Sequence, residues 1–536
     1  MSCSKIFSGD LPELTYEVMK YFQNDFLTLY SCILVNRLWC RLAIPLLWEN
    51  PFSIPTKNYK FIEIYLQNLK DNDFKTKSKI YKIDDNLFYL NTLFNYPNFI
   101  KYINLLKVIK SVGKWFEDSV RTLKSGNRYF LQNPDKLSTF NFKRLIYISL
   151  FKIFIENEVN LNILNIDIFP ISSYVTYYYD IFVLILQNSN FIHNIKNLNL
   201  YIGSEPSSVL IYNNNSENAL IKSQILQVIN LHQNLKKIIL DNDSFPYYQS
   251  LFLSKEYNCS NTLNTIILYQ VNFNSIINLD KIFEQLNVLE SVHISYCFPL
   301  NSNFIQQIIN LTKPFKLKSL FIEGRLQINL LELLLQKSGD YLENFAVSGF
   351  SHYDSSSKRQ LIGLITKYCN NIKFLALYGF ETQITHLIES INRNLNYLSI
   401  LINEIYRDHN VGYNSTFLQN LGQILPSKLE YLSLSLFIKK SDFKIFLENT
   451  QNTFINRLVI VQQSEDDILH YIKEFIMKEK RVKYLAIRNL RNILDLSTLK
   501  DEVNEFMLYN IIVLNFFKLY LHVRNYEFVK NIDYYS

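Results

Sequence analysis

Glycine and proline are scarce in this chain of 536 residues, which holds 11 and 12 of them. So few glycines leave little material for phosphate-binding loops, and no G-x-x-x-x-G-K-[ST], G-x-G-x-x-G or G-x-S-x-G motif occurs. The six cysteines are scattered, and no C-x-x-C occurs. These absences argue against a disulfide scaffold and against the common nucleotide-binding and hydrolase motifs. They predict a protein of a reducing compartment, cytoplasmic or nuclear or both.

Histidine is also sparse, because the eight residues lie far apart and form neither H-x-x-x-H nor H-E-x-x-H. His293 falls in a strand-like stretch that would point it to one face of a sheet, where a satisfied or exposed histidine is a simpler interpretation than a metal ligand. The acidic run at positions 465–467 precedes a helix-like stretch, where capping explains it. We expect no catalytic residue, no metal and no cofactor, although an enzyme with an unfamiliar site stays open.

The net charge of +7 is a small excess for this length. The densest basic stretch, residues 69–86, interleaves four aspartates and is interpreted as solvated surface, so we expect no nucleic-acid partner. A basic concave face that binds nucleic acid remains an alternative, which steep salt dependence would support. Residues 506–523 are long enough for a membrane span, but Asn510, Asn515 and Lys518 interrupt them. We expect no membrane partner and predict a buried end of the fold there.

What the chain has in quantity is apolar material, at 48% hydrophobic residues, and two of its three tryptophans lie nine positions apart near the N-terminus. Within LPELTYEVMKYFQNDFLTLYSCILVNRLWCRLAIPLLWENP (residues 11–51), apolar steps of three and four predict a helix over 15–22. Asp25 and Asn36 are placed to cap a second and a third helix, and Pro45 is expected to end the third. So small a unit cannot bury all these apolar side chains alone. Cys32 and Cys40 are interpreted as small core residues.

This segment resembles the F-box, the module by which F-box proteins hold the Skp adaptor of cullin-based ubiquitin ligases. The resemblance rests on Leu-Pro-Glu at 11–13, on spaced aliphatic residues, on VNRLW at 35–39 and on PLLW at 45–48. It covers about a tenth of the chain. It implies that the adaptor is contacted by Leu11, Pro12, Leu14, Val18, Leu29, Val35 and Trp39.

A second pattern recurs beyond residue 160, where an aliphatic residue is followed by apolar residues three and five positions later. It occurs twelve times, starting at Leu161, Ile195, Leu235, Leu263, Leu289, Leu317, Leu342, Ile372, Leu395, Leu429, Ile455 and Val482. Chance alone could match that number, but from Leu235 to Leu395 the intervals are 28, 26, 28, 25, 30 and 23 residues. The second residue is always Lys, Asn or Glu, and helix-like stretches such as 275–289 and 359–372 precede most units.

A short strand plus a helix every 23 to 34 residues resembles the leucine-rich repeat. That family's Asn or Cys, eight residues after the first Leu, is matched by Cys297, so an irregular solenoid is expected. The predicted fold class is a three-helix F-box followed by an α/β leucine-rich-repeat solenoid, an irregular horseshoe. We expect an adaptor-binding domain over 1–50, a mainly helical connecting region over 51–160 and repeats over 161–536.

F-box segments followed by such repeats are a known family arrangement, which implies a non-enzymatic substrate-recognition subunit of a Skp-cullin-F-box ubiquitin ligase. Its partners would be the Skp adaptor, through it a cullin, and a protein target whose identity the sequence does not give. Repeat surfaces contact targets through exposed strand residues, but the sequence does not identify which residues of this chain would bind the target. The alternative is a non-degradative interaction scaffold whose F-box-like segment packs internally.

Overall fold

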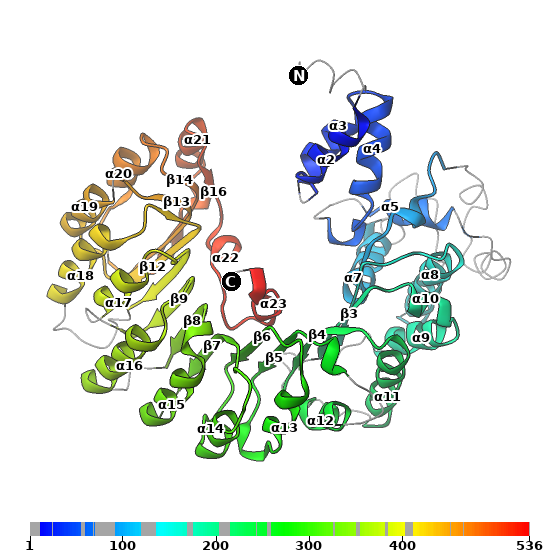
Figure 1. Cartoon of the computed structure of the whole chain (residues 1–536). Coiled ribbons are helices and arrows are strands. Elements are labelled where there is room, and N and C mark those ends of the chain that lie inside the picture. Colours follow the sequence, from blue (N-terminus) through cyan, green and yellow to red (C-terminus); the bar gives the residue numbers. More distant parts are fainter. Residues whose placement is uncertain are drawn as a thin grey trace. The chain divides into compact units, whose positions relative to one another are not determined.

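The structure of the chain is a computed structural model (Figure 1). It describes residues 11–23, 25–54, 59–67, 69, 92–118, 136–168, 175–202, 215–242, 244–253, 259–324, 327–349, 354–380, 384–402, 411–450, 452–464, 466–491 and 493–534. The chain divides into two compact units, residues 1–238 with 255–263 and residues 239–254 with 264–536. Helices alternate with mostly parallel strands in an α/β arrangement, and in neither unit do the strands close on themselves. Of the stretches interpreted above, residues 70–86 and Glu465 lie outside the described residues.

The first unit begins with three short helices, α2 (Pro12–Lys20), α3 (Phe26–Ile33) and α4 (Arg37–Leu47). Both predicted caps are confirmed, because the side chain of Asp25 accepts a hydrogen bond from the N–H of Thr28, and that of Asn36 from the N–H of Trp39. Each bond satisfies a backbone donor that has no partner within its helix. The capping residues thus decide where α3 and α4 begin.

The prediction that Pro45 ends the third helix is wrong, because α4 continues through it to Leu47. Proline removes one backbone donor, but it lies in the last turn, where that loss costs a single bond. The N–H of Trp48 still bonds to the carbonyl of Ile44, and Leu46 is buried. Burial of the apolar side chains around Pro45 therefore outweighs the missing bond.

The rest of the first unit carries helices and the first strands. Its elements are α5 (Phe61–Leu66), β1 (Tyr102–Asn104), α7 (Leu105–Phe116), α8 (Lys136–Glu156), β2 (Ile163–Ile168), α9 (Val175–Leu186), α10 (Ser189–His193), β3 (Asn197–Ile202) and α11 (Asn215–His232), followed by β4 (Leu235–Leu240). Strand β1 pairs in parallel with β2, and β2 with β3. The sequence predicted a mainly helical region over 51–160 and no strand there, so β1 is an addition.

The second unit repeats a strand and a helix. Its strands are β5 (Thr265–Tyr269), β6 (Ser291–Ser295), β7 (Leu317–Glu323), β8 (Asn344–Ser348), β9 (Phe374–Tyr378), β10 (Tyr397–Leu401), β11 (Lys428–Leu429), β12 (Tyr431–Leu436), β13 (Phe454–Gln462), β14 (Val482–Asn489), β15 (Leu494–Asp495) and β16 (Ile512–Val513). Its helices include α12 (Phe245–Leu253), α13 (Leu279–Gln285), α14 (Ser302–Ile309), α15 (Ile328–Ser338), α16 (Ser355–Tyr368), α17 (Ile384–Ile391), α18 (Val411–Ile424), α19 (Lys440–Asn449), α20 (Leu469–Ile472), α21 (Lys500–Leu508), α22 (Phe516–Leu519) and α23 (Tyr526–Lys530).

Each of the twelve recurring spacings falls on a strand, from β2 to β10 and from β12 to β14. In the second unit these strands are parallel to their neighbours. Two further strands pair with β14: β15 is antiparallel to it, and β16 is parallel. Helices α13 to α19 lie along one face of the strands (Figure 1). That face is apolar, with register-paired residues such as Leu320, Phe345 and Leu375. The recurring apolar residues therefore bury one face of each strand beneath a helix.

The polar residues at the second position of the spacings contact one another across neighbouring strands. Glu343 lies between two lysines, with its Oε1 3.4 Å from Nζ of Lys318 and its Oε2 3.1 Å from Nζ of Lys373. A similar link joins Glu430 to Asn456, whose Nδ2 donates over 2.8 Å. Partners on neighbouring strands explain why this position is polar in these five units.

The stretch 506–523, considered as a membrane span, is broken into the end of α21, strand β16 and helix α22. Phe506, Ile511, Phe516 and Leu519 are buried within the fold. Within the described part of the chain, no helix combines the length and the apolar character needed to cross a bilayer.

Candidate protein-interaction surfaces

The three N-terminal helices close a small core of their own. Met19 of α2, Leu29 and Cys32 of α3, and Ala43 and Leu46 of α4 are buried against one another. Trp39 packs against this core and remains partly exposed, as do Phe22 and Leu42. The predicted contact residue Leu29 has no exposed surface. It can hold α3 in place, but it cannot touch a partner of these helices.

The other sides of α2 and α3 carry exposed apolar side chains. On α2 and directly after it, Leu14, Val18 and Tyr21 follow each other at steps of four and three, and Tyr21 is 89% exposed. On α3 and directly after it, Leu27, Tyr30 and Leu34 follow each other at steps of three and four, and they are 83%, 59% and 72% exposed. We call these two rows the exposed helix stripes. Two apolar rows on neighbouring helices are typical of a surface that binds another protein.

The structure places the predicted adaptor-contact residues unequally. Leu14 and Val18 belong to the first stripe, and Val35, in the turn between α3 and α4, is 55% exposed. Leu11 and Pro12 are half-buried at the start of α2, where the carbonyl of Leu11 accepts hydrogen bonds from the N–H and the hydroxyl of Thr15. These contacts set the direction in which the chain enters the helix.

Sequence reasoning missed four side chains of the stripes, namely Tyr21, Leu27, Tyr30 and Leu34. The signal was present, because Leu27, Tyr30 and Leu34 repeat at steps of three and four within the second helix. The same helix holds a second apolar row with Leu29 and Cys32, which the structure buries. Periodicity identifies two apolar faces on α3, but it does not say which one the core takes.

The two neighbouring tryptophans belong to different clusters. Trp39 packs on the core of the three helices, whereas Trp48 packs against rings that follow in the chain. Its ring centroid lies 5.3 Å from that of Tyr65 and 4.2 Å from that of Tyr96. The carbonyl of Glu49 also accepts the N–H groups of Lys101 and Tyr102. The end of α4 is therefore fixed to the rest of the first unit, while the stripes are not covered.

In the second unit, the face of the strands opposite the helices is covered by residues 514–534, which we call the C-terminal segment. Figure 1 shows its helices α22 and α23 on the side of the strands away from α14 to α16. The ring of Phe528 lies 5.9 Å from Phe321 of β7 and 5.4 Å from Phe374 of β9. Tyr526 packs on Tyr269 of β5 at 5.7 Å. The segment thus spans several strands.

Polar contacts fix the same segment. The guanidinium of Arg524 lies 2.9 Å from Oε1 of Glu323 and 3.0 Å from Oγ of Ser348. The carbonyl of Arg524 accepts the hydroxyl of Tyr269, and the hydroxyl of Tyr431 accepts the N–H of Leu521. Bonds to strands as far apart as β5 and β12 give the segment one defined path over the strands.

Small side chains on the covered face make room for the segment. Across six strands the residues paired in register with Phe321 are Ser295, Ala346, Ala376, Ser399 and Ser433. All five are buried although three of them are serines. Parallel sheets bury both faces, and here the chain itself supplies the second layer. The residues of β6 to β12 that face the C-terminal segment are therefore buried by the chain itself.

His293, which the sequence analysis placed in a strand, lies on this covered face. His293 is fully buried, with its Nδ1 2.6 Å from Oγ of Ser319 and its Nε2 3.1 Å from Oδ1 of Asp533 in the C-terminal segment. Ser319 in turn accepts a hydrogen bond from Asn344 on the next strand. These are structural contacts between strands and segment, as expected for a satisfied histidine.

In the core, burial disfavours the charged forms of two thiols and two phenols. Burial raises the pKa of the Cys297 thiol and of the Cys369 thiol to about 12, so neither is a thiolate at neutral pH. Burial likewise raises the pKa of Tyr296 and of Tyr378. Among the residues that the structure describes, no group of three or more His, Cys, Asp and Glu side chains is placed to hold a metal ion.

Comparison with known proteins identifies no relative. A scan against models of protein families and a search of curated proteins both found no match to this chain. The resemblances to the F-box and to the leucine-rich repeat therefore depend on the residues and the geometry described above.

Proposed function

We propose that this chain is the target-recognition subunit of a Skp-cullin-F-box ubiquitin ligase. Helices α2 to α4 bind the Skp adaptor, and the second unit holds a protein target. The observation that carries the proposal is the pair of exposed helix stripes on a segment with a closed core of its own. A module that had to bury these side chains inside its own chain would not leave Leu27 and Leu34 in water.

The order of the sequence motifs supports the same interpretation. The Leu-Pro-Glu opening starts α2, and the VNRLW motif forms the end of the turn between α3 and α4, the capping Asn36 and the first residues of α4. Leu14, Val18 and Val35, three residues that the resemblance assigns to the adaptor, are exposed. The motif residues that are buried, Leu29 above all, account for the fold of the segment.

The leucine-rich-repeat interpretation of the second unit is supported at Cys297. Its thiol, directly after β6, donates to the carbonyl of Leu268 over 3.3 Å and accepts the N–H of Val271 over 3.4 Å. A buried side chain that bonds the backbone of the preceding repeat is what the matched family position would provide. The alternation of parallel strands and helices over β5 to β14 is consistent with it.

The alternative, an interaction scaffold whose F-box-like segment packs internally, has one observation in its favour. Trp48 and the carbonyl of Glu49 fix the end of α4 to the first unit. That packing involves α4 and not the stripes of α2 and α3. Internal packing explains Trp48, whereas adaptor binding also explains the exposed leucines and tyrosines.

The mechanism that we propose is proximity and needs no catalytic residue in this chain. The chain would hold its target while the ligase joined through the adaptor brings activated ubiquitin near lysines of the target. Because the C-terminal segment covers the strand face from β5 to β12, the target must be bound by other parts of the second unit.

The proposal is tested by binding of the full chain to a purified Skp adaptor. Leu27→Asp with Leu34→Asp places two carboxylates on the α3 stripe and touches none of the core residues. We expect at least a 100-fold loss of adaptor affinity with an unchanged thermal transition, because each charge would be desolvated in the interface. The Leu11→Ala with Pro12→Ala variant should weaken binding as well.

Leu93→Asp is the matched control, because Leu93 is equally exposed, at 82%, and lies outside the three helices. This variant should bind the adaptor as the original chain does. If the folded original chain does not bind the adaptor, or if the α3 stripe variant binds as well as the control, the ligase interpretation is wrong and the scaffold takes its place.

A further inference from the structure

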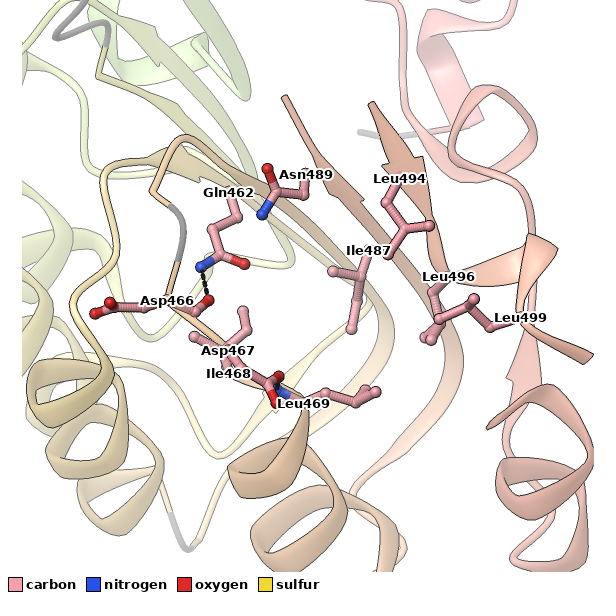
Figure 2. Close-up of a pocket in the computed structure, with 10 residues that line it drawn as sticks. All are labelled: Gln462, Asp466, Asp467, Ile468, Leu469, Ile487, Asn489, Leu494, Leu496 and Leu499. Carbon is pink, nitrogen blue, oxygen red and sulfur yellow. Dashed lines mark hydrogen bonds between the residues drawn. The ribbon is translucent and has the colours of Figure 1, made fainter. Parts of the chain in front are cut away.

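A small pocket opens at the carboxyl ends of β13 and β14, next to the start of α20. Its volume is about 230 Å³, whereas small-molecule sites commonly have volumes of about 300–1,000 Å³. The pocket is therefore closer in size to a single side chain than to a cofactor. Its wall is mostly aliphatic and is formed by Ile468, Leu469, Ile487, Leu494, Leu496 and Leu499 (Figure 2).

One buried amide is held so that its oxygen faces this wall. Nε2 of Gln462 donates to Oγ of Ser464 over 2.9 Å and to the backbone carbonyl of Asp466. Because a carbonyl can only accept, the amide nitrogen must lie on that side and the oxygen on the other. Figure 2 shows Oε1 of Gln462 directed into the pocket, and no described residue donates a hydrogen bond to it. Gln462 is 3% exposed, so this acceptor is shielded from bulk water.

The other polar side chains that line the pocket have different roles. Asn489 is fully used, because its Nδ2 donates to a backbone carbonyl and its Oδ1 accepts the backbone N–H of Arg491. Asp466 and Asp467 are exposed, and each carboxylate accepts a backbone N–H. Figure 2 shows the carboxylate of Asp466 directed away from the pocket. Among the described residues that line the pocket, Oε1 of Gln462 is thus the one buried side-chain polar atom without a partner.

We propose that this pocket binds the side chain of a tryptophan of the target protein. The indole ring would lie against the aliphatic wall, and its Nε1–H would donate to Oε1 of Gln462. The indole nitrogen only donates and needs no donor in return. This matches the pocket, because the amide donors of Gln462 and Asn489 are already used inside the protein.

The pocket discriminates against other side chains for physical reasons. A leucine or phenylalanine would fit the wall, but it would remove water from Oε1 of Gln462 without replacing the hydrogen bond, which is costly for a buried acceptor. An arginine or lysine would lose the hydration of a full charge, and one neutral amide oxygen does not compensate that loss. A tyrosine hydroxyl has lone pairs for which the pocket offers no free side-chain amide donor. The indole combines an apolar ring with a group that only donates.

The side chains beside the pocket favour a protein, rather than a free small molecule, as the source of the indole. Leu494 lines the pocket and is itself exposed, as are Leu490 and Ile493, its neighbours in the chain. Exposed apolar side chains beside a pocket are typical of a protein-binding surface, where the residues that flank an anchoring side chain cover them. Assigning the tryptophan to a target rests on the proposed function, but the pocket itself can be tested without the adaptor.

The probe is the peptide acetyl-Ala-Trp-Ala-amide, observed by saturation-transfer NMR with the full chain. The matched peptide carries 3-benzothienylalanine in place of tryptophan, which keeps the shape of the ring and replaces the N–H with a sulfur that donates no hydrogen bond. We expect saturation of the indole protons and a dissociation constant at least 5-fold higher for the benzothienyl peptide. Equal affinities of the two peptides, or no signal from the tryptophan peptide, would overturn the assignment.

Two variants make the test specific to the pocket. Gln462→Met removes the acceptor at nearly equal side-chain length, so the two peptides should bind alike and the tryptophan peptide at least 5-fold more weakly than to the original chain. Leu494→Trp should fill the pocket and remove both signals, and it should fold even if Gln462→Met does not, because Leu494 is partly exposed. Leu508→Trp, on the exposed end of α21, is the matched control and should change neither signal. A Leu494→Trp chain that binds the tryptophan peptide like this control contradicts the assignment.

The same samples separate the two proposals. The Leu494→Trp variant should bind the Skp adaptor like the original chain. Adaptor binding without a preference for the tryptophan peptide would remove the pocket assignment and leave the ligase proposal intact. That preference in a chain that fails to bind the adaptor would keep the pocket and overturn the ligase proposal.

Discussion

The exposed helix stripes of the first unit and the covered strand face of the second unit differ in the exposure of their side chains. On α2 and α3, leucines and tyrosines remain in water although the helices have a complete core beneath them. On β5 to β12, even serines are buried, because the C-terminal segment covers them. The comparison teaches that a surface expected to bind a partner can be filled by the chain itself. It also teaches that a small closed core can leave apolar side chains exposed, and this exposed surface is where we propose that a partner binds.

The largest loss of stability is expected from removing the C-terminal segment, which covers the strand face of the second unit. Truncation after Leu514 removes seven buried apolar side chains, those of Phe516, Leu519, Val523, Tyr526, Phe528, Val529 and Ile532. At about 1.5–3 kcal/mol for each, the loss is on the order of 10 kcal/mol, so the second unit should lose its cooperative unfolding transition. Calorimetry and hydrogen exchange of β6 to β9 would measure it.

Met507→Ser with Leu508→Ser is the control for the truncation, because both side chains lie exposed on α21 just before the segment. It should leave the transition in place. An unaltered transition in the truncated chain would mean that the segment rests on the strands without stabilising them.

The next prediction compares the free energy of unfolding after a substitution in the core of the three helices with that after a substitution in an exposed stripe. Leu29→Ala should lower the free energy of unfolding by about 2–5 kcal/mol, because it leaves a cavity in the core. Leu27→Ala, two positions earlier on the same helix, should change it by less than about 0.5 kcal/mol. Urea denaturation followed by tryptophan fluorescence would compare the two. Equal costs would mean that the α3 stripe is buried in solution.

A smaller effect is expected from the start of α4, which fixes Val35 beside the stripes. Asn36→Ala removes the cap on the N–H of Trp39 and should cost about 1 kcal/mol. Asn50→Ala is the matched control, because Asn50 also precedes a short helix but its side chain makes no capping bond there. A thermal melt in which both alanine variants behave alike would remove the role assigned to Asn36.

The smallest effect concerns pH at the start of α3. Hydrogen bonds from the hydroxyl and then the N–H of Thr28 lower the pKa of the Asp25 carboxyl. A carboxyl whose pKa is lowered in the folded state adds stability above its ordinary pKa of about 3.9, and this is lost as pH falls through the lowered value. The gap in melting temperature between the original chain and Asp25→Asn should therefore shrink below pH 4. A constant gap would show that the charge is irrelevant to the cap.

Much of the fold was predictable because it depends on local patterns. Asp25 and Asn36 identified two helix starts, since a capping side chain acts on the backbone three residues away. The apolar spacing located twelve strands, because burial beneath a helix requires alternate apolar residues on each strand. Pro45 misled the sequence analysis, since its effect depends on how much apolar surface the next turn buries.

The sequence by itself determined the starts of α3 and α4, the twelve recurring strand spacings and the motif residues of α2 to α4. Tertiary structure alone decided which apolar row of α3 is buried, that Trp48 packs away from Trp39, and that residues 514–534 cover the strand face. It also brought Gln462 and the aliphatic side chains of Ile487 and Leu499 around one pocket. The physical reason is range: caps and periodicity act within a few residues, whereas burial depends on contacts such as Phe528 with Phe321, which lie 207 residues apart in the sequence.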